Sequence, residues 1–141
     1  MIVIDTNVLS EAMHPRGAFV VKEWLDTVEQ HVAISVVTLQ EVAYGAHRLN
    51  DSQRREGILA ALAAIQTASG LATLPIDDEV ALLAGSLLGR RSMGGRPMSE
   101  ADAQIAATCL VHDATLATRN AKDFDGLGLK LLDPWADSDA D

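Results

Sequence analysis

The chain has 141 residues, of which 48% are apolar and 22% are charged, a composition that excludes intrinsic disorder and is sufficient for one folded domain. Eleven lysines and arginines against 20 aspartates and glutamates give a net charge of −9, which excludes attraction of a nucleic acid by the overall field. The single cysteine, Cys109, excludes a disulfide framework and a cysteine-rich zinc site, and its apolar neighbours predict a core position. No apolar run approaches the roughly 18 residues of a membrane span and the N-terminus lacks a basic leader, so we expect a cytoplasmic protein.

Short apolar runs rich in β-branched residues alternate along the chain with longer segments of helical periodicity. In chain order, strands are expected at residues 2–4, 31–34, 71–74 and 115–118, with a fifth at 129–132. Helices are expected from 5 to the break at 14–17, over 19–28, from 35 or 36 to about 49, from 52 to near 70, from 77 to the loop at 94–97, and from 99 to 110. The alternation indicates one α/β domain over residues 1–136, with a central parallel sheet of four to five short strands flanked by helices. Residues 120–128 are expected to form a loop, and the acidic tail 137–141 is expected to fray.

In an open α/β sheet, ligands bind at the carboxyl ends of the strands, and Asp5 directly follows the first expected strand. It can cap the next helix or, if Thr6 or Asn7 supplies the cap, remain free for a ligand, and the spacing leaves both roles open. Asp102 fits the third helical position of a capping box opened by Ser99, so local rules favour a structural role. The neighbouring residues in the sequence are nonetheless strongly apolar. A charged carboxylate among apolar residues is costly unless a metal ion or another charge neutralises it.

Other acids have ordinary explanations when they are taken one at a time. Glu41 lies in the middle of an expected helix and alone is best explained as a solvated side chain. The apolar stripe beside it is expected to hold Val36, Leu39, Ala43 and Ala46. Asp77 is expected to be a helix cap, and Asp123 and Asp125 lie in the expected loop. Several acids near strand ends, with no catalytic arrangement of Ser, His or Cys, indicate hard-cation chemistry, in which Mg²⁺ or Mn²⁺ takes oxygen ligands and acts on phosphates.

Three groups of basic residues could attract a polyanion locally despite the negative net charge. Their members are Arg48, Arg54 and Arg55; Arg90, Arg91 and Arg96; and Arg119 with Lys122. An arginine in the last turn of a helix interacts favourably with the helix dipole, which is the simpler explanation for such a residue. We therefore favour solvated helix ends for the arginines in these positions.

Four segments of the sequence resemble, in order, the motifs of PIN-domain ribonucleases. The run Val3-Ile4-Asp5-Thr6-Asn7-Val8-Leu9 is similar to a first strand that ends in a metal-binding aspartate, and residues 37–45 are similar to a second segment with a Glu followed by a Gly one turn later. Residues 102–107 resemble the third motif, and residues 116–120 with Asp123-Phe124 resemble the fourth. The segments span nearly the whole chain. Within the family they best match VapC-type toxins of bacterial toxin–antitoxin modules, including the FitB-like branch.

This resemblance implies a PIN-like fold in which Asp5, Glu41 and Asp102 face one metal site with one or two Mg²⁺ (or Mn²⁺) ions. It implies endonucleolytic cleavage of RNA by a metal-activated water, which leaves a 3′-hydroxyl and a 5′-phosphate. Asn120 stands where many members carry an acid, so either Asp123 or Asn120 completes the site as a further ligand or catalytic residue. The side chains expected to orient the carboxylates are Thr6, Asn7, Thr118 and Asn120.

The same resemblance implies protein partners. A toxin of this type is expected to bind a cognate antitoxin, VapB-like or FitA-like, in an apolar groove between the early helices near Phe19, Trp24 and Leu25. The family also forms homodimers, and we expect one here, without attachment to a membrane.

Two other functions stay open at this stage. One is a PIN fold that binds RNA or a partner without cutting, which Asn120 supports. The other is a haloacid-dehalogenase-like phosphatase with Asp5 as its nucleophile. The phosphatase ranks lower because its second aspartate would stand where the chain has Asn7.

Overall fold

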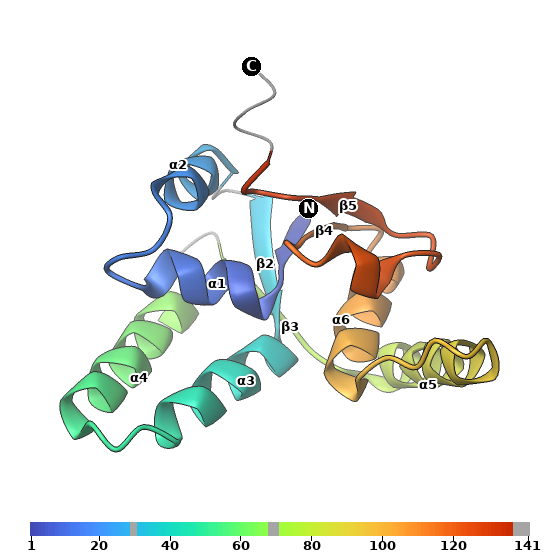
Figure 1. Ribbon diagram of the computed structural model, residues 1–141, viewed down its shortest axis with the longest axis horizontal. Coiled ribbons are helices and arrows are strands. Elements are labelled where there is room, and N and C mark those ends of the chain that lie inside the picture. Colours follow the sequence, from blue (N-terminus) through green and yellow to red (C-terminus); the bar gives the residue numbers. More distant parts are fainter. Residues whose placement is uncertain (29–30, 68–70, 137–141) are drawn as a thin grey trace.

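The computed structural model describes residues 1–28, 31–67 and 71–136, and these form a single α/β domain around a five-stranded parallel sheet, as expected. The strands are β1 (Ile2–Ile4), β2 (Val32–Ser35), β3 (Ala72–Leu74), β4 (Thr115–Ala117) and β5 (Lys130–Leu132). Their order is β3-β2-β1-β4-β5, so the first strand of the chain lies in the middle (Figure 1). The strand order therefore switches direction between β1 and β4, and parallel sheets bind ligands at such a switch, beyond the carboxyl ends of the strands.

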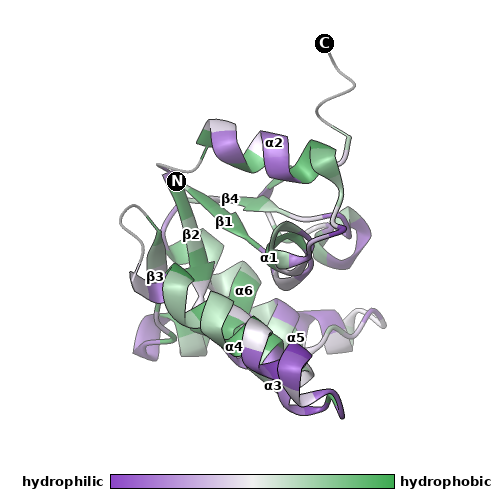
Figure 2. Ribbon diagram, turned by 90° about the vertical axis from the view of Figure 1, so that its left-hand side faces the viewer, coloured by the Kyte–Doolittle hydropathy of each residue, from purple (hydrophilic) through white to green (hydrophobic). Residues whose placement is uncertain are grey.

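Helices cover both faces of the sheet. They are α1 (Thr6–Met13), α2 (Phe19–Val28), α3 (Val36–His47), α4 (Ser52–Thr67), α5 (Asp78–Met93) and α6 (Glu100–Val111), with the 3₁₀ helix η2 (Ala121–Phe124). Val3 packs in the core that α5 and α6 cover, and the next residue, Ile4, packs in the core that α1, α2 and α4 cover, because successive side chains of a strand point to opposite faces. Hydrophobic residues accordingly fill β1, β2 and much of α6 (Figure 2). In the described residues, no helix combines the length and apolarity that a membrane crossing requires.

Among the described residues, five helices begin at polar caps. Asp51 caps α4, accepting from the N–H groups of Gln53 at 3.0 Å and Arg54 at 3.1 Å. The other four caps fix the entry points of the chain along the carboxyl edge of the sheet. Asp5 caps α1, Ser35 caps α3, Asp77 caps α5 and Ser99 caps α6, each by accepting a hydrogen bond of 2.9–3.1 Å from a main-chain N–H of the first turn. Because Asp5 and Ser35 adjoin β1 and β2 directly, the helices that follow start without a connecting loop.

Most element predictions are confirmed to within a residue or two. The expected end of α4 near residue 70 and the expected tail at 137–141 lie outside the described residues. The loop expected at 120–128 contains η2, which the sequence analysis did not predict. The apolar stripe predicted for α3 is confirmed in part, because Ala46 is buried and Leu39 and Ala43 pack against the core. The most buried face of the helix is rotated from the predicted one. Its buried residues are Val37, Thr38, Val42 and Ala46.

Candidate functional site

The carboxylate of Asp5 lies at the carboxyl end of β1, beside the end of β4. The main-chain N–H of Asp5 donates to the carbonyl of Ala117 at 3.1 Å and so ties the two strand ends together. Asp5 is 6% exposed, and this burial raises the pKa of its carboxyl group, whereas hydrogen bonds from the Thr118 side chain and from the main-chain N–H groups of Val8 and Asn7 favour the charged form and lower it. Asp5 therefore caps α1 and also brings a buried negative charge to the switch point.

Glu41 reaches the same region from α3. The hydroxyl of Thr6 donates to Oε1 of Glu41 at 2.5 Å, and the Thr6 oxygen lies 3.3 Å from the buried hydroxyl of Thr38. Glu41 is exposed, yet its negative charge is near enough to contribute to the raised pKa of Asp5. A side chain that looked merely solvated in the sequence is thus oriented towards the end of β1 by two hydroxyl groups.

Asp102 enters from the first turn of α6 and is half-buried. Its main-chain N–H donates to the hydroxyl of Ser99 at 3.1 Å, as the capping-box pattern predicts. Burial raises the pKa of the Asp102 carboxyl group, a hydrogen bond with the Ser99 side chain lowers it, and the negative charges of Asp123, Glu41 and Asp5 raise it further. Four carboxylates from four separate segments of the chain therefore act on one another.

The fourth motif is anchored to the end of β4. The main-chain N–H of Asn120 donates to the hydroxyl of Thr118 at 3.0 Å, and the N–H of Asp123 donates to the Asn120 carbonyl at 2.9 Å. Asp123, which is exposed, brings its charge near Asp102, whereas the Asn120 side chain makes no cap for η2. Asn7 acts on Asp5 through its main-chain N–H.

The chemistry of these donors fits a hard divalent cation, because carboxylate oxygens are the ligands that Mg²⁺ and Mn²⁺ prefer. A cation would also offset the burial and repulsion that raise the pKa values of Asp5 and Asp102. Over residues 1–28, 31–67 and 71–136, however, no three carboxylate, histidine or cysteine side chains are spaced to hold one ion as they stand. Two of the four carboxylates, Glu41 and Asp123, are exposed.

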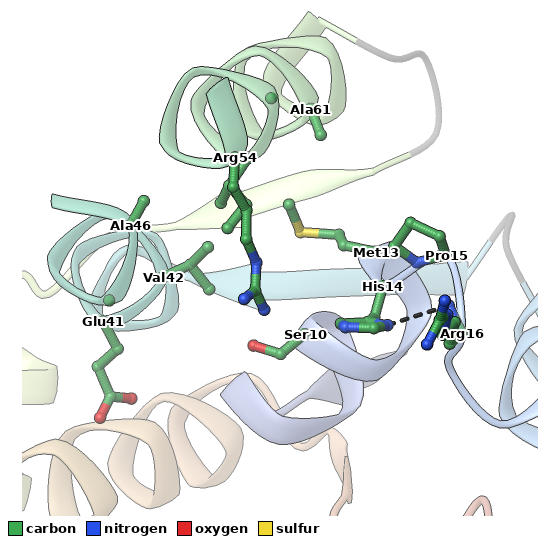
Figure 3. A pocket seen from close by; sticks show the side chains of 13 residues that line it. Ser10, Met13, His14, Pro15, Arg16, Glu41, Val42, Ala46, Arg54 and Ala61 are labelled. Atoms are coloured by element: carbon green, nitrogen blue, oxygen red, sulfur yellow. Dashed lines mark hydrogen bonds between the residues drawn. The ribbon is translucent and has the colours of Figure 1, made fainter. Parts of the chain in front are cut away.

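An apolar cavity of about 630 Å³ adjoins Glu41 between α1, α3 and α4. Figure 3 shows Arg54 projecting from α4 towards Ser10 of α1, with Val42 and Glu41 on the neighbouring helix. This cavity is not the groove that was expected for the antitoxin near Phe19, Trp24 and Leu25, because none of these three residues lines it.

Two residues support the site in ways that the sequence did not predict. Thr38 was not among the residues predicted for the apolar face of α3, but it is fully buried there. Arg91 was taken for a helix end, but its guanidinium donates to the main-chain carbonyls of Asp123 at 3.0 Å and Asp125 at 2.8 Å. No sequence pattern signals such a contact, because every residue carries a carbonyl group.

Comparison with known proteins agrees with this arrangement. Residues 2–128 match the PIN domain. The VapC ribonuclease Y4jK of Sinorhizobium fredii is 31% identical over an alignment of 144 residues, which covers 96% of this chain and 98% of the relative. Toxin FitB of Neisseria gonorrhoeae is 30% identical over 139 residues, covering 97% of this chain and 100% of FitB. The crystal structure of FitAcB from Neisseria gonorrhoeae superposes with a TM-score of 0.82 at 30% identity, over 96% of this chain and 99% of that chain. The resemblance inferred from the four segments is thereby confirmed, and the chain belongs to the PIN-domain family.

Proposed function

We propose that this chain is the toxin of a toxin–antitoxin module and that it cuts RNA internally with the help of a divalent metal ion. The relatives that match almost its whole length carry the names VapC ribonuclease and toxin FitB. The observation that supports the metal-dependent mechanism is the gathering of acids around Asp102: burial raises the pKa of its carboxyl group, and the nearby negative charges of Asp123, Glu41 and Asp5 raise it further. Like charges gathered in a half-buried place destabilise the fold unless a cation is bound among them.

Asp5, Glu41 and Asp102 would hold the ion, Mg²⁺ or Mn²⁺, and Asp123 is the fourth acid of the proposed catalytic set. When bound, Mg²⁺ supplies two things: a lower pKa for a coordinated water and stabilisation of negative charge on the phosphate that is cut. Cys109 is excluded as a nucleophile because it is fully buried and its burial raises the pKa of the thiol to about 12.

The chain's own contribution is to fix the carboxylates before the substrate arrives. Asp5 cannot rotate freely, because its Oδ1 accepts from the Val8 N–H at 2.9 Å. Thr6 orients Glu41, and Thr118 interacts with Asp5 and also accepts from the N–H of Asn120. Such supporting hydrogen bonds affect metal affinity or activity by about 10- to 100-fold in comparable sites.

The test uses the purified chain and a structured RNA, with Mg²⁺, with Mn²⁺ and with EDTA. We expect cleavage that leaves 5′-phosphates, stops in EDTA, and falls at least about 100-fold in Asp5→Asn and Asp102→Asn. Asp77→Asn is a matched control, because Asp77 also lies between a strand and a helix that it caps, with a 2.9 Å hydrogen bond, but β3 is the edge strand. Cleavage that survives both EDTA and Asp5→Asn would refute the proposal.

A PIN fold that binds without cutting is the second candidate, favoured by Asn120 and by the spacing of the acids. Binding of RNA by the unaltered chain in Mg²⁺ and in Mn²⁺, with no cleavage in either, would select it. The family assignment lends no support to the phosphatase alternative.

The proposed partner is an antitoxin. Solved relatives include a FitA–FitB complex bound to a DNA fragment, at 29% identity and a TM-score of 0.81. The cavity between α1, α3 and α4 suits a nonpolar segment, and a basic side chain of that segment could reach Glu41 at its edge. Co-purification with the product of a neighbouring gene, lost on Gly45→Asp, tests this partner, because Gly45 lines the cavity, is exposed and has open space around an added Cβ. The expected homodimer remains a prediction, which analytical ultracentrifugation can check.

A further inference from the structure

A second, polar cavity of about 470 Å³ adjoins Asp102 and Asp123, whereas the apolar one adjoins Glu41. It is lined by Asp102 and Asp123 and by three cationic side chains, Arg91, Arg96 and Lys122. In a chain with a net charge of −9, three cations at one cavity beside the candidate site are an unusual concentration of positive charge. They come from α5, from the loop before α6 and from η2, so the fold gathers them from separate segments.

Dipole compensation, which the sequence favours for an arginine in a last helical turn, does not apply to Arg96 or Lys122, because both lie outside α5. Arg90 fits it, since it lies exposed in the last turn of α5. Arg91 instead sends its guanidinium across to η2. Arg96 and Lys122 are exposed, and among the described residues neither forms an ion pair with a carboxylate. Their charges are therefore available to an anion in the cavity.

The backbone holds these cations in place. The N–H of Arg96 donates to the carbonyl of Arg91 at 2.9 Å, after a turn in which Gly95 adopts a φ of 74° that favours glycine. Arg91 in turn binds the carbonyls on either side of Phe124, and so fixes the turn that carries Lys122. Two exposed cations on anchored turns lose less freedom on binding an anion than two on mobile segments would.

We propose that Arg96 and Lys122 bind a backbone phosphate of the RNA next to the bond that is cut, an inference that rests on the proposed function. Lysine and arginine contacts to phosphates supply most of the affinity of proteins for nucleic acids, and they position the strand without reading its sequence. The two cations stand at the edge of the acidic cluster. They would hold the neighbouring phosphate beside the carboxylates that would bind the metal ion. Arg91 is a positioning residue for this cleft.

The test compares the double variant Arg96→Gln/Lys122→Gln with Arg90→Gln, which removes a nearby charge that does not line the cavity. Cleavage kinetics are measured in Mg²⁺. Binding of a labelled single-stranded RNA is measured by fluorescence anisotropy in EDTA over a range of salt concentrations. For the double variant we expect KM to rise about tenfold or more with little change in kcat. We also expect the slope of log affinity against log salt to become shallower by about 1.4, which corresponds to two lost phosphate contacts. Arg90→Gln should match the unaltered chain in both measurements.

Several outcomes would overturn the proposal. A double variant with the KM and salt slope of the unaltered chain would show that the cleft does not hold RNA, while leaving the proposed function intact. Loss of binding to a polyglutamate peptide, with RNA binding unchanged, would assign the cleft to an acidic protein segment instead. An unaltered chain that does not cut RNA would refute the proposed function, and the anisotropy experiment would still decide whether the cleft binds RNA.

Discussion

Replacing Arg91 with lysine keeps a positive charge at the polar cleft but removes the planar guanidinium that joins α5 to the turn carrying Asp123. The guanidinium donates to three main-chain carbonyls: Asp125 at 2.8 Å, Asp123 at 3.0 Å and Arg96 at 3.4 Å. A single ammonium group cannot reproduce this fork, because its donors radiate from one atom. The substitution therefore separates the bridging role of Arg91 from its charge.

The expected loss follows from the number of bonds. A lysine that retains one of the two short bonds gives up the other short bond and the long one. At about 0.5–1.5 kcal/mol for each of the two lost hydrogen bonds, the free energy of unfolding falls by about 1–3 kcal/mol. The larger penalty of a buried unpaired carbonyl does not apply, because Asp123, Asp125 and Arg96 are exposed and water can replace the lost donors. For a chain of 141 residues, this loss lowers Tm by about 3–10 °C.

The assay is thermal unfolding followed by circular dichroism, together with cleavage rates well below Tm. Arg90→Lys is the control, since it makes the same substitution one residue earlier at an exposed position and should leave the free energy of unfolding within about 0.5 kcal/mol. We expect Arg91→Lys to lower kcat as well, because the Asp123 turn loosens while the chain remains folded. Equal Tm values for the two variants would refute the bridging role of Arg91.

Three further predictions concern the folded chain. Burial raises the pKa of Asp5 above 3.8, so the Asp5 carboxyl group keeps its proton to a higher pH in the folded state than in the unfolded state. Without metal, the free energy of unfolding should therefore fall as pH rises from about 3.8 through the raised pKa. Asp5→Asn, which preserves the cap, should lessen that fall in urea titrations across pH, and an unchanged pH dependence would contradict the assignment. Cys109, with its pKa raised to about 12, should resist a thiol reagent at neutral pH until urea unfolds the chain, and rapid reaction of the native protein would contradict its burial. A Cβ on Gly17 would lie 2.0 Å from the Glu11 carbonyl oxygen, so Gly17→Ala should lower Tm. Gly89→Ala, in an open helical position, should raise stability by up to about 1 kcal/mol, and equal Tm changes in the two variants would refute this reasoning.

The order of the elements could be predicted from the sequence because its signals are local. Asp77 and Ser99 are polar residues just before an apolar helical pattern, and both cap helices in the structure. The rotation of α3 could be predicted only in part. Ala46 is buried as expected, but the burial of Thr38 depends on β2 running directly into the helix at Ser35, and apolar periodicity does not select a threonine for the core.

The candidate site, too, could be predicted from the sequence only where the signals are local. Asp5 could be placed at a strand end from the sequence, and Asp102 at a helix start. Their mutual proximity depends on β4 returning beside β1, which no local pattern specifies and which only the resemblance to a family supplied. The role of Arg91 was beyond reach, because its partners are main-chain carbonyls of a turn 32 and 34 residues further along the chain.

The central position of β1 affects when the protein can complete its fold during synthesis. β1 is made first, but Ile2 pairs with Thr115 of β4, so one side of the central strand stays open until the ribosome has added more than a hundred further residues. The acids are likewise distributed from residue 5 to residue 123. A growing polypeptide therefore cannot assemble the cluster before its C-terminal part has been made, and any activity that needs all four acids begins only when synthesis is nearly complete.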